Sequence, residues 1–264
     1  MPARYKTMQS VAALVGVMAA TTGCEPNAKP VETNPPKEAI VNSTEPAQKP
    51  IETSAASGRV EVNGTPDSRG ALSLSGRGAS IRIEKCSLAE VSPTVSRCEG
   101  DTYVDFTHEG ERHSILLTSL YIDRTATFYR GPLDQEYKQN GHSFVLTDVD
   151  GDGHEDLIVW TGKEGAYGGP SYEVLLFDQK DNQFNVAPML SDLTVGANGL
   201  FSIEDGRLVT SSSDGCCMRV FETFTVTNGE PNLVERVTET RHEAGGAIST
   251  KTERMVDGQL QEVI

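Results

Sequence analysis

The chain has 264 residues, of which 38 are acidic and 23 are lysine or arginine, so its formal net charge is −15. This balance makes nucleic acid a poor partner, because the phosphate backbone is bound mainly through lysine and arginine. The negative charge either serves only to keep the protein soluble or also speeds its encounter with a basic protein.

Residues 1–23 have the pattern of an export signal, in which basic residues precede an apolar run at 11–20. The run is too short to span a bilayer as a permanent helix. The small residues that follow lead directly to Cys24, and they resemble the lipobox of bacterial lipoproteins, whose cysteine is lipidated. We therefore expect a signal peptide at 1–23 and a lipid on Cys24. An ordinary signal peptide with Cys24 as a spare thiol is the alternative.

Residues 24–57 have the composition of a flexible linker. Pro, Glu, Thr, Asn, Ala and Lys dominate, so the segment cannot bury enough apolar surface to offset the entropy lost on ordering. Lipidated Cys24 and this linker would hold a soluble domain close to a membrane. We expect a periplasmic protein that is lipid-anchored to the cell envelope, with the outer membrane favoured over the inner.

Alternating apolar and polar runs dominate the chain from residue 58 onward, and helical periodicity is scarce. Short connections separate these runs, which predicts antiparallel pairing and an all-β fold, an antiparallel β-sandwich or meander. We divide this part into an N-terminal β region at 58–139 and a second β domain at 140–264. Strands are expected at 59–62, 71–74, 80–84, 102–106, 114–118, 144–146, 157–160, 172–177, 184–186, 201–203, 207–210, 219–226 and 233–237, with a final hairpin across 257–258.

The chain has four cysteines besides Cys24. Because the protein is expected to be exported to an oxidising compartment, these cysteines are expected to form disulfides. Cys86 and Cys98 flank a short turn-like segment and are the expected disulfide pair. Cys216 and Cys217 are adjacent, which allows a vicinal disulfide, while crosswise pairing with Cys86 and Cys98 is the competing connectivity. A redox or catalytic role for the adjacent pair is disfavoured, because it lacks the spacing of a Cys-x-x-Cys motif.

The segment 148–156 has the strongest motif of the chain. Carboxylates fall at positions 1, 3, 5 and 9 of a loop with glycine at position 6 and a backbone carbonyl offered at position 7. A valine at position 12 and strand-like flanks exclude an EF-hand, so we expect a strand-loop-strand calcium site. Its all-oxygen donors favour Ca²⁺ over Mg²⁺. An acidic turn without an ion is disfavoured, because close carboxylates raise each other's pKa. The expected ligands are Asp148, Asp150, Asp152, His154 through its carbonyl, and Asp156.

A glycine-rich segment follows the acidic loop and contains one central aromatic residue. Its members of interest are Gly165, Tyr167, Gly168, Gly169 and Tyr172. Either Tyr167 protrudes into the cleft of a partner, or it folds back over its own core. Catalysis by this chain is not expected, since its histidines lack metal-ligand spacing and no Gly-x-Ser-x-Gly motif is present.

The runs 148–159, 165–172, 174–178 and 214–218 together resemble a family of exported calcium-binding lipoproteins typified in Xanthomonas. The resemblance covers roughly residues 140–240 and the lipobox. It implies a fold similar to periplasmic lysozyme inhibitors, and a role as an immunity protein against peptidoglycan hydrolases delivered by type IV secretion systems. It also implies that the four aspartates bind the ion and that Tyr167 enters the cleft of a lysozyme-like hydrolase, where a phenol can hydrogen-bond the catalytic carboxyl group.

Two other functions compete with inhibition. The first is an integrin-like calcium-binding module for adhesion or envelope binding, but a single calcium motif is too few for a ring of blades. The second is an envelope-bound hydrolase, whose paired carboxylates would have to come from the acidic loop, where the ion occupies them.

Overall fold

The structure is a computed structural model in which residues 59–76, 79–108, 110–134, 137, 141–242 and 246–263 are described. They all belong to one compact unit, Thr53–Ile264. The predicted signal peptide, Cys24 and the linker lie outside the described residues. Within the described ranges, no helix is both long and apolar enough to cross a membrane.

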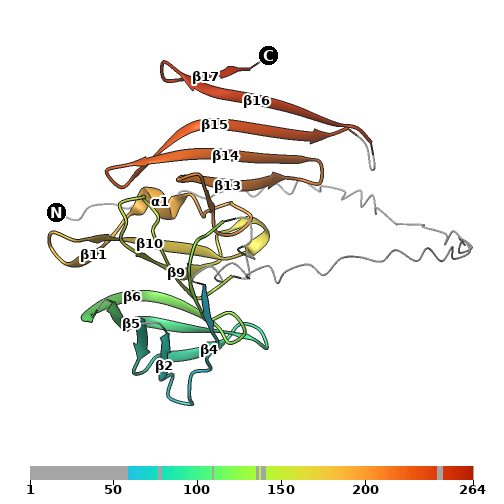
Figure 1. The fold of residues 1–264 in the computed structure, drawn as a ribbon. Coiled ribbons are helices and arrows are strands. Elements are labelled where there is room, and N and C mark those ends of the chain that lie inside the picture. The colour runs from blue at the N-terminus through green and yellow to red at the C-terminus, as the bar shows by residue number, and fades with distance from the viewer. Residues whose placement is uncertain are drawn as a thin grey trace, which may run out of the picture. The chain divides into compact units, whose positions relative to one another are not determined.

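The prediction of an all-β fold is confirmed, and the described strands form three sheets (Figure 1). The first sheet consists of β2 (Leu72–Gly76), β3 (Ala79–Ile83), β5 (Val95–His108) and β4 (Ser87–Glu90), with β6 (Glu111–Asp123) also paired to β5. The central sheet consists of β1 (Val60–Val62), β7 (Phe128–Arg130), β8 (Phe144–Thr147), β9 (Asp156–Gly162), β10 (Ser171–Asp178) and β11 (Gln183–Val186). The third consists of β12 (Ser202–Glu204), β13 (Arg207–Asp214), β14 (Met218–Thr227), β15 (Glu230–Arg241), β16 (Ile248–Val256) and β17 (Gln259–Glu262).

The middle strands β8 and β9 of the central sheet are buried on both faces, and this explains their continuous apolar runs. Successive side chains of these strands alternate between two hydrophobic clusters. One cluster contains residues of the first sheet, and the other contains residues of β13 and β14. Phe144, Leu146, Leu157 and Val159 belong to the former, whereas Val145, Ile158 and Trp160 belong to the latter. Strand β9 is therefore held from both sides along its length.

The predicted disulfide between Cys86 and Cys98 is confirmed. It joins the segment before β4 to β5, and Cys98 is fully buried in the cluster beneath the first sheet. This pairing excludes the crosswise connectivity with the adjacent cysteines at 216 and 217.

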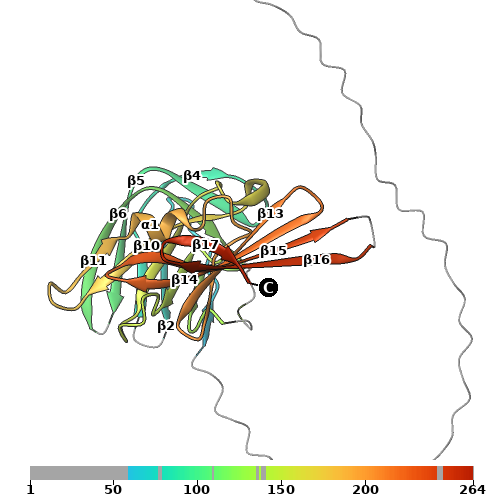
Figure 2. The same cartoon turned by 90° about the horizontal axis from the view of Figure 1, so that it is seen from above.

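The third sheet differs from the other two in its exposure, since β16 contains no buried residue. Its outer strands carry cross-strand ion pairs, including Arg236 with Glu222 at 2.6 Å and Arg254 with Glu235 at 2.8 Å. Such pairs suit a sheet surface that faces water. Figures 1 and 2 show this sheet in orange and red, with β15 to β17 on its outer side. The short helix α1 (Pro188–Asp192) contacts both β10 and β15.

Candidate functional site

Two loops of contrasting chemistry adjoin strand β9. The acidic loop, residues 148–156, precedes and enters the strand. The tyrosine loop, residues 162–171, connects its end to β10. The two loops are thus attached to opposite ends of β9. This strand is held in place because most of its residues are buried.

The acidic loop is shaped by its own carboxylates. Asp148 accepts hydrogen bonds from the backbone N–H groups of Gly151 at 2.8 Å and Gly153 at 3.0 Å. Both glycines have positive φ angles, 80° and 91°, a conformation that side-chain-bearing residues rarely adopt. The alternation of aspartate and glycine is therefore what lets the chain curl around its acidic side chains.

Asp156 ties the acidic loop to the central sheet. Its side chain is buried, with 1% of the residue exposed. Its two carboxylate oxygens accept the N–H of Val149 at 2.7 Å and the N–H of Phe177, in β10, at 2.8 Å. Burial raises the pKa of Asp156 to about 7, although these two hydrogen bonds act to lower it. A buried carboxylate in this state is stabilised as an anion when a cation lies beside it.

Three of the four predicted carboxylate ligands converge. Asp148, Asp150 and Asp156 each offer an oxygen, and these atoms lie within 4.8 Å of one another. Oxygens that each lie about 2.4 Å from one calcium ion are separated by at most about 4.8 Å, so the spacing fits a Ca²⁺ site. Burial raises the pKa of Asp150, and the charges of Asp152 and Asp148 raise it further, a repulsion that a bound cation would relieve.

The remaining two predicted ligands lie differently. Asp152 is exposed, and one of its oxygens accepts the N–H of His154 at 2.8 Å. The ring of His154 lies 5.9 Å from that of Phe177, so its side chain packs against an aromatic residue. The carbonyl of His154 therefore stays a predicted ligand.

The tyrosine loop presents its aromatic residue to solvent. Tyr167 is 82% exposed and has a left-handed backbone, with φ 56° and ψ 26°. Its hydroxyl donates a hydrogen bond to the carbonyl of Gly215 at 3.2 Å. Of the two expected arrangements, the exposed one is found. Tyr172, in contrast, is buried in β10, and its N–H donates to Thr194 Oγ1 at 2.9 Å.

The glycines of the tyrosine loop have different structural roles. A Cβ at Gly165 would lie 2.5 Å from the carbonyl oxygen of Pro170, so no larger residue fits there. Gly168 has a φ of 76°, and the Gly169 N–H donates to the carbonyl of Ala166 at 3.0 Å. These positions allow a tight turn that pushes the Tyr167 side chain outward.

A second segment, residues 194–197, fixes the tyrosine loop from outside. The Ala166 N–H donates to the carbonyl of Ala197 at 2.7 Å, and the Gly196 N–H donates to the carbonyl of Glu164 at 2.7 Å. The sequence analysis does not predict that this segment, or the turn at Gly215, contacts the tyrosine loop. Their only local signal is a turn-forming glycine, which does not reveal the distant segment that it contacts.

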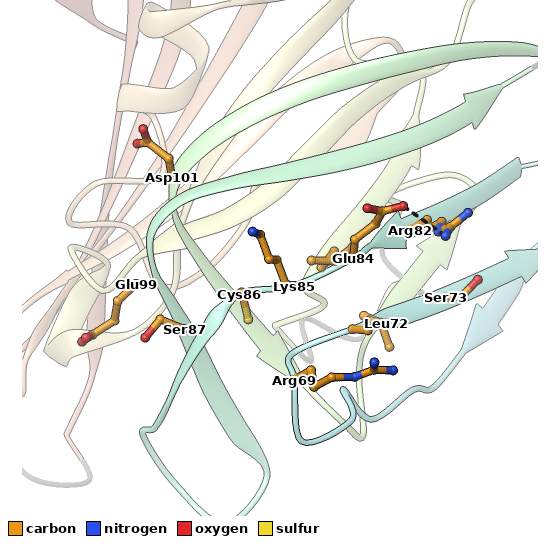
Figure 3. Close-up of a pocket in the computed structure, with 12 residues that line it drawn as sticks. Arg69, Leu72, Ser73, Arg82, Glu84, Lys85, Cys86, Ser87, Glu99 and Asp101 are labelled. Carbon is orange, nitrogen blue, oxygen red and sulfur yellow. Dashed lines mark ion pairs between the residues drawn. The ribbon is translucent and has the colours of Figure 1, made fainter.

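A large cavity lies elsewhere, at one end of the first sheet (Figure 3). It is an open groove of about 1020 Å³ near the Cys86–Cys98 disulfide, and its lining includes no residue of the acidic or tyrosine loops. Its charged side chains are of both signs, and Arg82 and Glu84 pair at 3.1 Å. The groove therefore has no concentration of one charge that would define a ligand.

The fold and these loops define a class of all-β protein with a loop of converging carboxylates and an exposed tyrosine loop at the two ends of one buried strand. No protein-family model and no curated protein matches the chain. A solved structure, described as that of a Xanthomonas type IV secretion system related protein, is 42% identical with a TM-score of 0.73. The match covers 78% of this chain and 99% of that one. The chain therefore belongs to the same family as this secretion-related protein.

Proposed function

We propose that this protein is a calcium-stabilised periplasmic lipoprotein that inhibits a lysozyme-like peptidoglycan hydrolase, and so acts as an immunity protein. The observation that carries the proposal is the position of Tyr167, an aromatic side chain 82% exposed on a loop held by backbone hydrogen bonds. Exposed aromatic residues on rigid loops are frequent anchors of protein interfaces. The relation to a type IV secretion system related protein supports a hydrolase delivered by such a system as the target.

The chemistry of the target makes a tyrosine a suitable inhibitor residue. A lysozyme-like enzyme works with a protonated carboxylic acid and a second carboxylate that flank the scissile bond in a sugar-binding cleft. A phenol ring can fill the place of a sugar, while its hydroxyl hydrogen-bonds the catalytic carboxyl group. Inhibition of this kind requires no turnover by the inhibitor. The net charge of −15 would in addition attract a basic hydrolase.

Calcium would act by fixing the strand that carries the tyrosine loop. Asp148, Asp150 and Asp156 would hold the ion, and Asp156 is already bonded to β10 through the N–H of Phe177. A bound ion adds a link between the acidic loop and the start of β9. The tyrosine loop at the other end of β9 would thus be presented by a more rigid support.

Lipidation of Cys24 would place the inhibitor at the envelope, where a hydrolase delivered from another cell arrives. The test is fractionation of cells that express the parent or the Cys24→Ser variant. We expect the parent in the membrane fraction and the variant in the soluble periplasmic fraction. A parent protein recovered wholly in the soluble fraction would contradict the anchor.

The function itself is tested by mixing the purified protein with a lysozyme-type hydrolase of the type IV secretion class and following lysis of a cell-wall suspension. We expect lysis to stop near a one-to-one molar ratio when calcium is present. Unchanged lysis at a large molar excess of the protein, for hydrolases of this class, would refute inhibition.

A further inference from the structure

The turn between β13 and β14 brings two sulfur atoms together beside the tyrosine loop. Cys216 and Cys217 are both exposed, and their Sγ atoms lie 2.7 Å apart. A covalent S–S bond is about 2.05 Å long, so a small adjustment of the side chains would suffice to form one. The confirmed disulfide between Cys86 and Cys98 leaves the adjacent pair as each other's partner within the described chain.

The turn is bonded on both sides of the pair. The carbonyl of Gly215 accepts the hydroxyl of Tyr167 at 3.2 Å, and the carbonyl of Cys217 accepts the N–H of Arg241, in β15, at 2.8 Å. The peptide between Cys216 and Cys217 lies between these two anchor points. A change in its conformation would therefore redirect the Gly215 carbonyl and disturb the hydrogen bond to Tyr167.

The cysteine pair and the phenol also share one surface. They line a cleft of about 380 Å³ together with residues of β14 and β15. The lining includes Tyr167, Cys216, Cys217, Met218, Arg219 and Glu239. A partner that engages Tyr167 would meet the cysteine turn in the same contact.

We propose that Cys216 and Cys217 are joined as a vicinal disulfide, and that this closed turn positions Tyr167 for contact with its target. The bond forms by exchange with a small-molecule or protein disulfide. One cysteine thiolate attacks that disulfide and releases the first thiol, and the second cysteine then attacks the mixed disulfide and releases the other. The dithiol is oxidised, one external disulfide is reduced, and the two thiol protons end on the released thiols.

The ring positions Tyr167 because it includes the peptide bond that follows Cys216. Closing it removes rotational freedom from the turn, and the Gly215 carbonyl is then held toward the Tyr167 hydroxyl. This positioning role refines the proposed inhibition. Only the expected effect on a hydrolase rests on the proposed function. The disulfide and its effect on the loop can be measured without any partner.

The bond is tested on the exported protein after exposure to glutathione disulfide, by alkylation under denaturing conditions and tryptic digestion. Cleavage after Arg207 and Arg219 gives one peptide, 208–219, that contains both cysteines. We expect this peptide without alkyl groups and lighter by two hydrogens than the dithiol form, and doubly alkylated only after reduction. Double alkylation without reduction, or two bound glutathiones, would overturn the proposal.

The positioning role is tested by amide hydrogen exchange in segment 163–170, with segment 148–156 as the internal reference. We expect the Cys216→Ser/Cys217→Ser variant to exchange about fivefold faster in the first segment, the effect of losing one hydrogen bond, and unchanged in the second. Tyr167→Phe, which removes the same bond, should match it. In the Tyr167→Phe background the two serines should add nothing, because both changes act through one contact. Additive effects, or a double-serine variant that exchanges like the parent, would overturn the role.

An inhibition assay separates this inference from the proposed function. If the exchange results hold but neither the serine variant nor Tyr167→Ala weakens inhibition, the hydrolase proposal fails and the disulfide inference stands. If Tyr167→Ala weakens inhibition while the serine variant exchanges and inhibits like the parent, the disulfide inference fails and the hydrolase proposal stands.

Discussion

The acidic loop and the tyrosine loop share strand β9 but are held in opposite ways. In the acidic loop, carboxylate side chains accept the loop's own N–H groups, as Asp148 does from Gly151 and Gly153. In the tyrosine loop, backbone groups bond to a distant segment, as Ala166 does to Ala197 at 2.7 Å. The first loop uses its carboxylates as acceptors for its own backbone, and Asp156 among them is buried. The second obtains its structure from the backbone and leaves its largest side chain outside.

This difference indicates that the two loops have different roles. A loop whose carboxylates converge within 4.8 Å can hold an ion but offers little to a protein partner. A loop whose tyrosine is 82% exposed can offer contact area but contributes little to the core. Stability should therefore depend on the acidic loop, and binding should depend on the tyrosine loop. Each of the following substitutions tests the role of one of the two loops.

Asp156→Ala should produce the largest effect, and on stability. It leaves the N–H groups of buried Val149 and half-buried Phe177 without their acceptor, and each unsatisfied buried donor costs about 1 to 3 kcal/mol. We expect a loss of about 2 to 6 kcal/mol in the free energy of unfolding, measured by urea denaturation in chelator. Asp67→Ala is the matched control, because Asp67 also accepts two backbone N–H groups but is exposed. Equal losses in both variants would contradict the special role of the buried carboxylate.

Calcium should raise the stability of the parent protein by mass action. At a calcium concentration about one hundredfold above the dissociation constant, the gain is about 2.7 kcal/mol. Thermal melts in excess calcium and in excess chelator should differ accordingly, and the difference should vanish in Asp148→Asn/Asp150→Asn. Asp67→Asn should keep the full difference, because among the described residues that carboxylate is not part of the converging group. Superimposable melts of the parent would show that the acidic loop binds no ion.

Tyr167→Ala should leave the melt almost unchanged and weaken inhibition. A buried aromatic anchor at an interface contributes about 2 kcal/mol, which corresponds to roughly a thirtyfold weaker inhibition constant. Tyr103→Ala is the control, because Tyr103 is 61% exposed but lies in β5 of the first sheet. If both variants inhibit like the parent, the tyrosine loop is not the contact surface. If Tyr167→Ala unfolds, the division between the two loops is wrong.

The sequence alone predicts those structural features that are formed by residues close together in the chain. The acidic loop is recognised because its carboxylates and glycines lie within nine positions, and the hydrogen bonds made within the loop span at most seven residues. The core strands β8 and β9 are recognised because both faces are buried and the residues are continuously apolar.

The sequence analysis misses features that depend on distant partners. The hydrogen bond from Tyr167 to Gly215 joins residues 48 positions apart, and nothing local to either residue specifies it. Strand β7 is not among the predicted strands, because three residues show too little alternation, and its parallel pairing with β8 is therefore missed as well. Helix α1 is missed because five residues are too few to show a helical period.

The smallest predicted effect concerns pH and the end of β9 that leads into the tyrosine loop. His142 is buried there, and the carbonyl of the adjacent Ser143 accepts the N–H of Trp160 at 2.9 Å. Burial lowers the pKa of His142, and the hydroxyl of Tyr137 lies 3.1 Å from its Nδ1. Because the folded protein resists protonation of this ring, the unfolded state binds more protons once the pH falls below the ordinary histidine pKa of about 6.5.

Stability that depends on His142 is therefore fully present above about pH 6.5 and is lost as the pH falls below it, with a slope of at most about 1.4 kcal/mol per pH unit. His142→Gln should flatten this part of the pH profile in urea denaturation. The matched control is His242→Gln, since His242 is exposed just after the end of β15 rather than buried beside β9. Because the acidic loop lies at the other end of β9, the calcium-dependent gain should be the same in parent and His142→Gln at neutral pH. A reduced gain in that variant would show that the two ends of the strand are energetically coupled rather than separate.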